Sequence, residues 1–183
     1  MEAESDIRFT GTDGVISADA EQVPAREVTA LYEAHALSLF RLAYVILGDR
    51  PAAEDVVQEA FLGLYKRWGK LRDTASAPGY LRTSVLNGSR MVLRSRTRHD
   101  GRAASELPWE SAEATAIVGE EHRHLLLAIQ ALPPRQREVL MLRYYLELSE
   151  GETAQSMGIR PGTVKSATSR ALAALGQRLQ EYS

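Results

Sequence analysis

A chain of 183 residues with 44% apolar residues, 25% charged residues and a formal net charge of −2 has room for one domain or two small ones. The lack of cysteine excludes disulfides and thiolate metal sites and fits a reducing cytoplasm. There is no uninterrupted run of about 18 apolar residues, and the N-terminus lacks the basic start and apolar core of a secretory signal, so we expect no membrane insertion and a cytoplasmic location.

Charge is distributed unevenly along the chain. Residues 1–27 hold seven acidic residues and two arginines, a net charge of −5, whereas residues 66–102 hold ten Lys or Arg and two Asp, a net charge of +8. Blocks of like charge are often interaction surfaces, and a basic block suits the phosphates of a nucleic acid. Residues 1–27 also lack a sustained apolar period, so we expect them to form a flexible acidic extension.

Residues 28–98 have the helical period and predict a first all-helical domain. Its first helix carries the apolar stripe Val28, Leu31, His35, Leu39, Leu42 and Ile46. We interpret His35 on that stripe as a core histidine and not as a ligand. Gly48 ends this helix, and Asp49 and Pro51 begin the second. The second helix carries the apolar stripe Val57, Phe61, Leu64 and Trp68 and leaves an acidic edge on its surface, which consists of Asp55, Gln58 and Glu59.

The composition of residues 69–79 predicts a loop, and a third helix is expected to start near Tyr80. The inward side of this helix carries Leu81, Val85, Gly88 and Val92. Arg90, Arg94 and Arg98 follow one another at i, i+4 and i+8, which predicts three aligned guanidinium groups on the outer side. Residues 99–119 contain Gly101, Pro108 and an acidic trend and are predicted to be a linker.

Residues 120–183 predict a second all-helical domain that ends in a helix-turn-helix. Ser149 and Glu152 form a capping-box pattern, Gly158 can end the first helix, and Pro161 suits the first turn of the next. That last helix has the apolar face Val164, Thr168, Ala171, Leu175 and Leu179. Its other side carries short donors and cations that suit a DNA groove and its phosphates, namely Thr163, Lys165, Ser166, Ser169 and Arg170.

The chain as a whole is predicted to be all-α, since no segment shows a convincing strand pattern. No nucleophile elbow, phosphate loop or paired-carboxylate motif is present, so we expect a protein that is not an enzyme and needs no cofactor. Only His122 and His124 have a close spacing, and residues two apart on a helix face different ways, so no metal site is expected.

Two segments carry a family resemblance: AEDVVQEAFLGLYKRW over residues 53–68 and LPPRQREVLMLRYYLELSEGETAQSMGIRPGTVKSATSRAL over residues 132–172. In this order and spacing, the chain resembles bacterial RNA polymerase sigma factors of the extracytoplasmic-function (ECF) type of the sigma-70 family. The resemblance implies two helical domains joined by a flexible linker: residues 28–98 bind core polymerase and the −10 element, and residues 120–183 bind the −35 element. The implied partners are core RNA polymerase (its β′ clamp helices and β flap), promoter DNA and an anti-sigma factor.

The resemblance also assigns roles to residues of this chain. Asp55, Gln58, Glu59 and Phe61 match the surface that binds the β′ clamp helices. The loop of residues 70–79 matches the segment that captures a flipped base, and Asn87 stands where the family often has an asparagine. Arg160 stands where a Ser or Thr cap is usual. The expected DNA-binding set is Arg82, Asn87, Arg90, Arg94, Arg98, Arg160, Thr163, Lys165, Ser166, Ser169 and Arg170.

Two alternatives stay open at this point. A helix-turn-helix regulator that binds duplex DNA without polymerase would need a sensor cavity in place of the acidic edge. A helical adaptor would show no salt-dependent binding of nucleic acid. The sequence also leaves open whether Lys165 and Arg170 contact a guanine edge or a phosphate.

Overall fold

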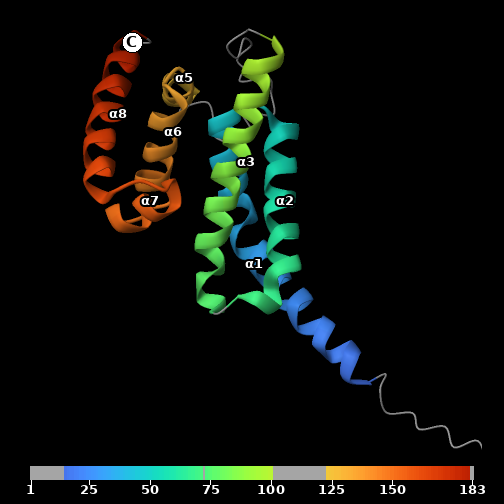
Figure 1. The fold of residues 1–183 in the computed structure, drawn as a ribbon. Coiled ribbons are helices and arrows are strands. Elements are labelled where there is room, and N and C mark those ends of the chain that lie inside the picture. Colours follow the sequence, from blue (N-terminus) through green and yellow to red (C-terminus); the bar gives the residue numbers. More distant parts are fainter. Residues whose placement is uncertain (1–14, 72, 101–122, 182–183) are drawn as a thin grey trace, which may run out of the picture.

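The computed structural model describes residues 15–71, 73–100 and 123–181, and all regular elements within these ranges are helical (Figure 1). The first part contains α1 (Val15–Leu47), α2 (Arg50–Arg67) and α3 (Ala77–Asp100), which all contact one another. The second part contains α5 (Arg123–Gln130), α6 (Pro134–Leu140), α7 (Glu150–Met157) and α8 (Pro161–Glu181). The all-α prediction is confirmed.

The turn between α1 and α2 forms as the sequence predicts. Gly48 has a φ of +65°, a conformation that glycine adopts without a steric penalty, and its N–H donates to the carbonyl of Tyr44 at 2.8 Å. The Asp49 carboxylate accepts a hydrogen bond from the N–H of Ala52 at 2.9 Å and so caps α2. The bundle core that follows is fully buried and includes Leu42, Ile46, Leu64, Leu81, Val85 and Leu86.

The start of α1 differs from the prediction. The helix begins at Val15 and passes through Pro24, so residues 15–27 are helical, although the sequence predicted no regular element there; residues 1–14 lie outside the described residues. No glycine lies between Val15 and Leu47, and Ala18, Ala20 and Glu21 are strong helix formers. The N-terminal turns of α1 project beyond α2 and α3 (Figure 1).

One segment, Pro24–Leu47, is long and apolar enough by length and composition to cross a membrane, with a mean hydropathy of 1.3. Charged residues such as Glu33 and Arg41 interrupt this segment, so it contains no continuous apolar run and was not predicted from the sequence. Leu42 and Ile46 in its C-terminal half are fully buried against the other helices of the bundle. Of its most apolar window, 39% is buried inside the structure, so the C-terminal half of the segment is a core helix of the bundle.

The connection from α2 to α3 is more ordered than a loop. Short 3₁₀ turns occupy Trp68–Lys70 and Thr74–Ser76, and α3 begins at Ala77, three residues before the predicted start. The Asp73 carboxylate accepts from the N–H of Ala75 at 2.9 Å, and such local side-chain caps are hard to see in the apolar period. Gly88 lies inward as predicted, since a Cβ there would stand 3.0 Å from Val56.

The helix-turn-helix forms with the predicted local chemistry. The Glu152 carboxylate accepts from the Ser149 N–H at 2.9 Å, and the Ser149 hydroxyl accepts from the Glu152 N–H at 3.2 Å. Gly158 has a φ of +68° and ends α7. A π-helical turn at Met141–Tyr145, which the sequence did not predict, leads from α6 toward the motif. Residues 99 and 100 belong to α3, and the rest of the predicted linker lies outside the described residues.

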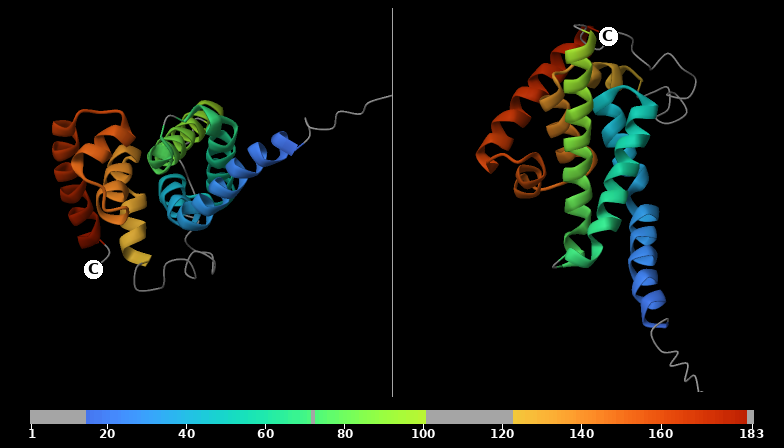
Figure 2. Two further views of the ribbon diagram at one scale, coloured as in Figure 1. Left: turned by 90° about the horizontal axis from the view of Figure 1, so that it is seen from below. Right: turned by 45° about the vertical axis from the view of Figure 1, so that its right-hand side comes forward.

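The two helical parts pack directly against each other (Figure 2). Helix α3 contacts α7, and α1 contacts α5 and α6. Buried apolar side chains of both parts belong to one continuous cluster, which joins Leu47 and Val85 to Leu132 and Leu140. The predicted linker does not imply that the two domains touch, so this packing could not be predicted from the sequence.

Candidate polymerase and nucleic-acid interface

The acidic edge of α2 lies on the surface. Asp55, Gln58 and Glu59 are exposed, as the sequence predicts. Phe61 is only 5% exposed, and its ring lies 5.0 Å from the ring of Tyr32 in an edge-on arrangement. The structure therefore buries Phe61, which the resemblance placed on the polymerase-binding surface, and its role in that surface stays a prediction. Its position on the apolar stripe of α2 directs it into the core, where it supports Tyr32.

An apolar groove borders the acidic edge. It has a volume of about 510 Å³ and is lined by Tyr32, Ala36, Leu37, Phe40 and Arg41 from α1 and by Arg50, Glu54, Val57 and Gln58 from α2. Leu37 is 61% exposed, and Tyr32 is 48% exposed. The groove was not predicted from the sequence, because its large apolar residues Tyr32 and Leu37 lie beside the buried stripe of α1 and not on it.

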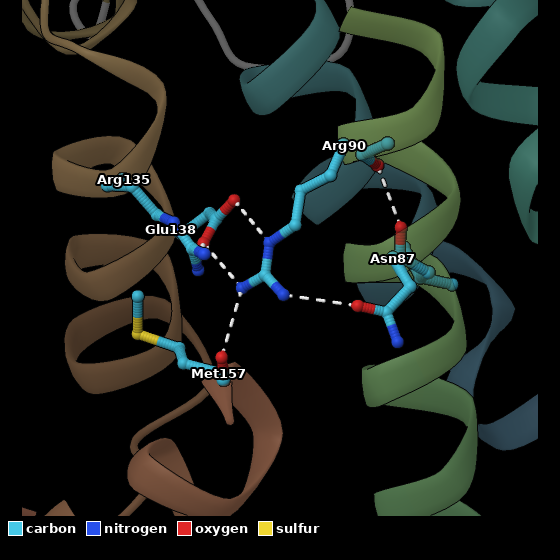
Figure 3. A network of polar contacts seen from close by, with 7 residues as sticks. Asn87, Arg90, Arg135, Glu138 and Met157 are labelled. Atoms are coloured by element: carbon cyan, nitrogen blue, oxygen red, sulfur yellow. Dashed lines mark hydrogen bonds and ion pairs between the residues drawn. The ribbon is translucent and has the colours of Figure 1, made fainter. Parts of the chain in front are cut away.

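The arginines of α3 do not share one environment. Arg94 and Arg98 are exposed, but Arg90 turns toward the second helical part (Figure 3). Its Nε donates to Oε1 of Glu138 at 2.9 Å, and its Nη2 donates to Oε2 at 2.7 Å. The predicted row of three outward guanidinium groups is wrong. A helix has 3.6 residues per turn, so each step of four residues rotates the side chain by about 40°, and two steps by about 80°.

Other arginines of the basic block have structural contacts that the sequence did not reveal. Arg96 donates to the carbonyl of Leu47 at 3.0 Å and to the Asp49 carboxylate at 2.7 Å, and it thereby holds the turn between α1 and α2. Arg82 is half-buried and lines a cavity of about 180 Å³ between the two parts, together with His35, Ser38, Leu39, Pro78, Leu146 and Leu148. His35 is half-buried there. Asn87 is exposed and accepts from Arg90 at 3.1 Å.

Helix α8 presents the predicted polar face. Val164 and Ala171 are fully buried, whereas the expected contact residues Arg160, Thr163, Lys165, Ser166, Ser169 and Arg170 are all exposed. The Arg170 guanidinium donates to the carbonyl of Ser166 at 3.2 Å, so it lies along the helix surface. A helix with this division can place its polar face in a major groove while its apolar face rests on its own domain.

The side chains described by the structure include no group of three His, Asp or Glu that could hold a metal ion. The described surface carries exposed cations on α3 and α8 and an acidic, partly apolar face on α1 and α2. These features suit polyanion and protein contacts.

Known families match both helical parts. The Sigma-70 region 2 family model matches residues 31–99, and the model for Sigma-70, region 4 matches residues 122–175. The chain is 32% identical over 143 residues to the RNA polymerase sigma-E factor of Streptomyces avermitilis, across 78% of this chain and 79% of that protein. It is 32% identical over 166 residues to the ECF RNA polymerase sigma factor SigL of Mycobacterium tuberculosis, across 88% and 94%.

Two solved structures share the fold. One is CnrH in complex with the cytosolic domain of CnrY, with a TM-score of 0.66 and 21% identity over 92% of this chain and 97% of that chain. The other is the sigma factor RpoE in complex with the anti-sigma factor NepR from Bartonella quintana, with a TM-score of 0.66 and 22% identity over 88% and 97%. A regulator with a separate sensor domain is not favoured, because the first helical part also matches a sigma region. The chain belongs to the sigma-70 family as an alternative sigma factor of the ECF type, which binds core RNA polymerase and directs promoter recognition and transcription initiation.

Proposed function

We propose that residues 28–98 bind core polymerase and the −10 element, that residues 120–183 bind the −35 element, and that the chain acts in the cytoplasm without catalytic activity of its own. Two surfaces support this division. The first is the acidic edge Asp55, Gln58 and Glu59 with the adjoining groove between α1 and α2. The second is the polar face of α8.

The −35 assignment depends on one observation: Thr163, Lys165, Ser166 and Arg170 are exposed on a helix whose opposite face, Val164 and Ala171, is fully buried. The N-terminal half of such a helix enters the groove, so Thr163 and Ser166 lie nearest the base edges. Lys165 and Arg170 add cations that bind a guanine edge or a phosphate.

Transcription from a promoter library with a randomised −35 element tests this assignment. Lys165→Ala and Arg170→Ala should each reduce transcription and still allow binding to core polymerase. A cation that reads a base contributes about 1–3 kcal/mol and its loss relaxes preference at one position, whereas a phosphate contact weakens all promoters equally. Gln177→Ala, also exposed on α8, is the matched control. Full activity with unaltered base preference in both variants would contradict the assignment.

An anti-sigma factor is a further proposed partner. It is suggested by the structural relatives, which were solved in complex with CnrY and NepR. The groove between α1 and α2 offers the exposed apolar side chains Tyr32 and Leu37 beside charged rims. A regulator that covers this groove would compete with core polymerase for the same face. Competition between a candidate regulator and core polymerase in a co-elution assay measures this directly.

A further inference from the structure

The contact between the two helical parts includes an ion pair that is largely buried. Arg90 on α3 and Glu138 on α6 form two parallel hydrogen bonds, and their side chains are 12% and 1% exposed. Arg135 adds a second cation to the same carboxylate at 3.2 Å, and the carbonyl of Met157 accepts from Arg90 at 3.5 Å (Figure 3). We name the pair Arg90–Glu138 the interdomain latch.

Hydrogen bonds to backbone carbonyls of α1 surround the latch. Arg137 donates to the carbonyl of Ile46 at 2.7 Å, and Gln130 donates to the carbonyl of Val45 at 2.8 Å, so both cap the C-terminal end of α1. Burial lowers the pKa of the Arg137 guanidinium, and Glu138 beside it partly offsets this effect. These carbonyls and donors can bind water once the two parts separate. The interface combines these polar contacts with the apolar cluster that joins the two parts, so the latch is one of several contributions that keep them closed.

The latch occupies the Nε and Nη2 donors of Arg90, which a DNA phosphate would otherwise accept from. A guanidinium binds a carboxylate or a phosphate in the same two-pronged way, so Arg90 cannot bind Glu138 and a DNA phosphate through the same donors at once. Arg94 and Arg98 stay exposed on the same helix and can meet DNA before the latch opens. The chain therefore has a free basic surface next to a blocked one.

We propose that Glu138 acts as an internal substitute for a promoter phosphate: it holds Arg90 and keeps the two helical parts closed, and DNA opens them by taking its place. This inference rests on the proposed DNA-binding role of α3. Closure and phosphate binding at Arg90 are mutually exclusive. By thermodynamic linkage, a change that weakens closure strengthens binding of DNA by the free chain, and DNA in turn promotes opening.

Fluorescence energy transfer across the two parts measures closure in the full chain. The chain contains no cysteine, so Lys66→Cys on α2 and Gln177→Cys on α8, both exposed, accept dyes selectively. Glu138→Gln keeps the shape of the side chain and removes its charge. This substitution should lower transfer efficiency and lower the apparent Kd for a promoter duplex. If one wild-type molecule in ten is open, the Kd falls by about tenfold.

Three further variants separate the latch from other effects. Glu147→Gln removes one exposed negative charge from the second part and controls for net charge. Arg90→Gln should also open the chain but should not tighten DNA binding, because the phosphate contact is lost with the latch. The exchanged pair Arg90→Glu with Glu138→Arg, made together with Arg135→Gln to remove the second cation at this site, should restore closure, which shows that the charges act on each other and that the single variants have not merely misfolded.

The outcomes are distinct. Unchanged transfer in Glu138→Gln and Arg90→Gln overturns the latch, and opening of Glu138→Gln with no gain over Glu147→Gln in DNA affinity overturns the exchange with phosphate. Run-off transcription by wild type with core polymerase reports on the proposed function separately. If the wild type initiates transcription while the latch variants behave like wild type in both assays, only this inference fails.

Discussion

At the scale of single residues, the same amino acid serves different purposes within one basic block. Arg94 and Arg98 are exposed, Arg96 holds the turn between α1 and α2, and Arg90 pairs with Glu138 on another helix. Charge and spacing indicate that such a block is an interaction surface, but they do not show which of its arginines are exposed and which pair with other residues of the chain. The assignment depends on which residue each guanidinium meets in space, and Glu138 lies 48 positions from Arg90.

The capping box of α7 gives a prediction at this scale. Hydrogen bonds from the Ser149 hydroxyl and then from its backbone N–H lower the pKa of Glu152, and Arg82 adds a smaller effect. A depressed carboxylate pKa stabilises the folded state above the ordinary value of 4.5 and loses that effect as the pH falls through the folded-state value. Acid should therefore weaken the helix-turn-helix.

Glu152→Gln tests this, since an amide oxygen still accepts from Ser149 but does not titrate in this range. The variant should show a smaller drop in its thermal unfolding midpoint between pH 5 and pH 3 than the wild type, followed by far-UV circular dichroism. Glu150→Gln removes an exposed carboxylate from the same turn and is the control. Parallel pH profiles for wild type and Glu152→Gln would show that the box does not titrate.

At the scale of elements, helix α3 has two working faces. One is packed into the first bundle through Leu81 and Val85, and through Gly88, which lets Val56 approach. The other carries Arg94 and Arg98 to solvent and Arg90 to the second helical part. A single element therefore links the core, the candidate DNA surface and the interdomain latch.

The salt dependence of promoter-complex formation should report on the exposed part of α3. Each phosphate contact contributes about 0.9 to the slope of log K against log salt for duplex DNA. If Arg94 and Arg98 each bind one phosphate, replacing both with Ala lowers the magnitude of the slope by about 2. Arg26→Ala removes an exposed cation from α1 and serves as the control. A slope equal to that of wild type would show that these arginines face away from DNA in the complex.

At the scale of the whole molecule, the two helical parts form one continuous apolar core and yet present separate surfaces. The acidic edge and groove lie on α1 and α2, and the exposed polar face of α8 belongs to the second part. Because the surfaces are separate, changes on one should not abolish the function of the other.

Charge reversal at the acidic edge tests this separation. Asp55→Lys with Glu59→Lys should weaken co-elution with core polymerase while leaving the helical content and thermal midpoint close to those of wild type, since changes at exposed sites usually alter stability by no more than about 0.5 kcal/mol. The double reversal Glu27→Lys with Glu147→Lys, at exposed positions outside the groove, has the same net charge and should co-elute normally. Normal co-elution of the first variant would remove the acidic edge from the polymerase surface.

The sequence by itself determined whatever depends on neighbours along the chain. The helical period placed Leu42, Leu64 and Val164 in the core, and Gly48 and Gly158 were recognised as turn residues because few others adopt a positive φ. The capping box and the exposed polar face of α8 were equally local. The family resemblance was also recognised from the sequence, because each of its motifs is a run of neighbouring residues.

Only the tertiary structure decided how distant segments meet. It buried Phe61, turned Arg90 to Glu138, extended α1 to Val15 and packed the two helical parts together. Periodicity says which side of a helix is apolar, but it does not say which other helix covers that side. Pairing across 48 positions depends on the free energy of the whole packed core, to which every contact contributes, and no local pattern encodes that sum.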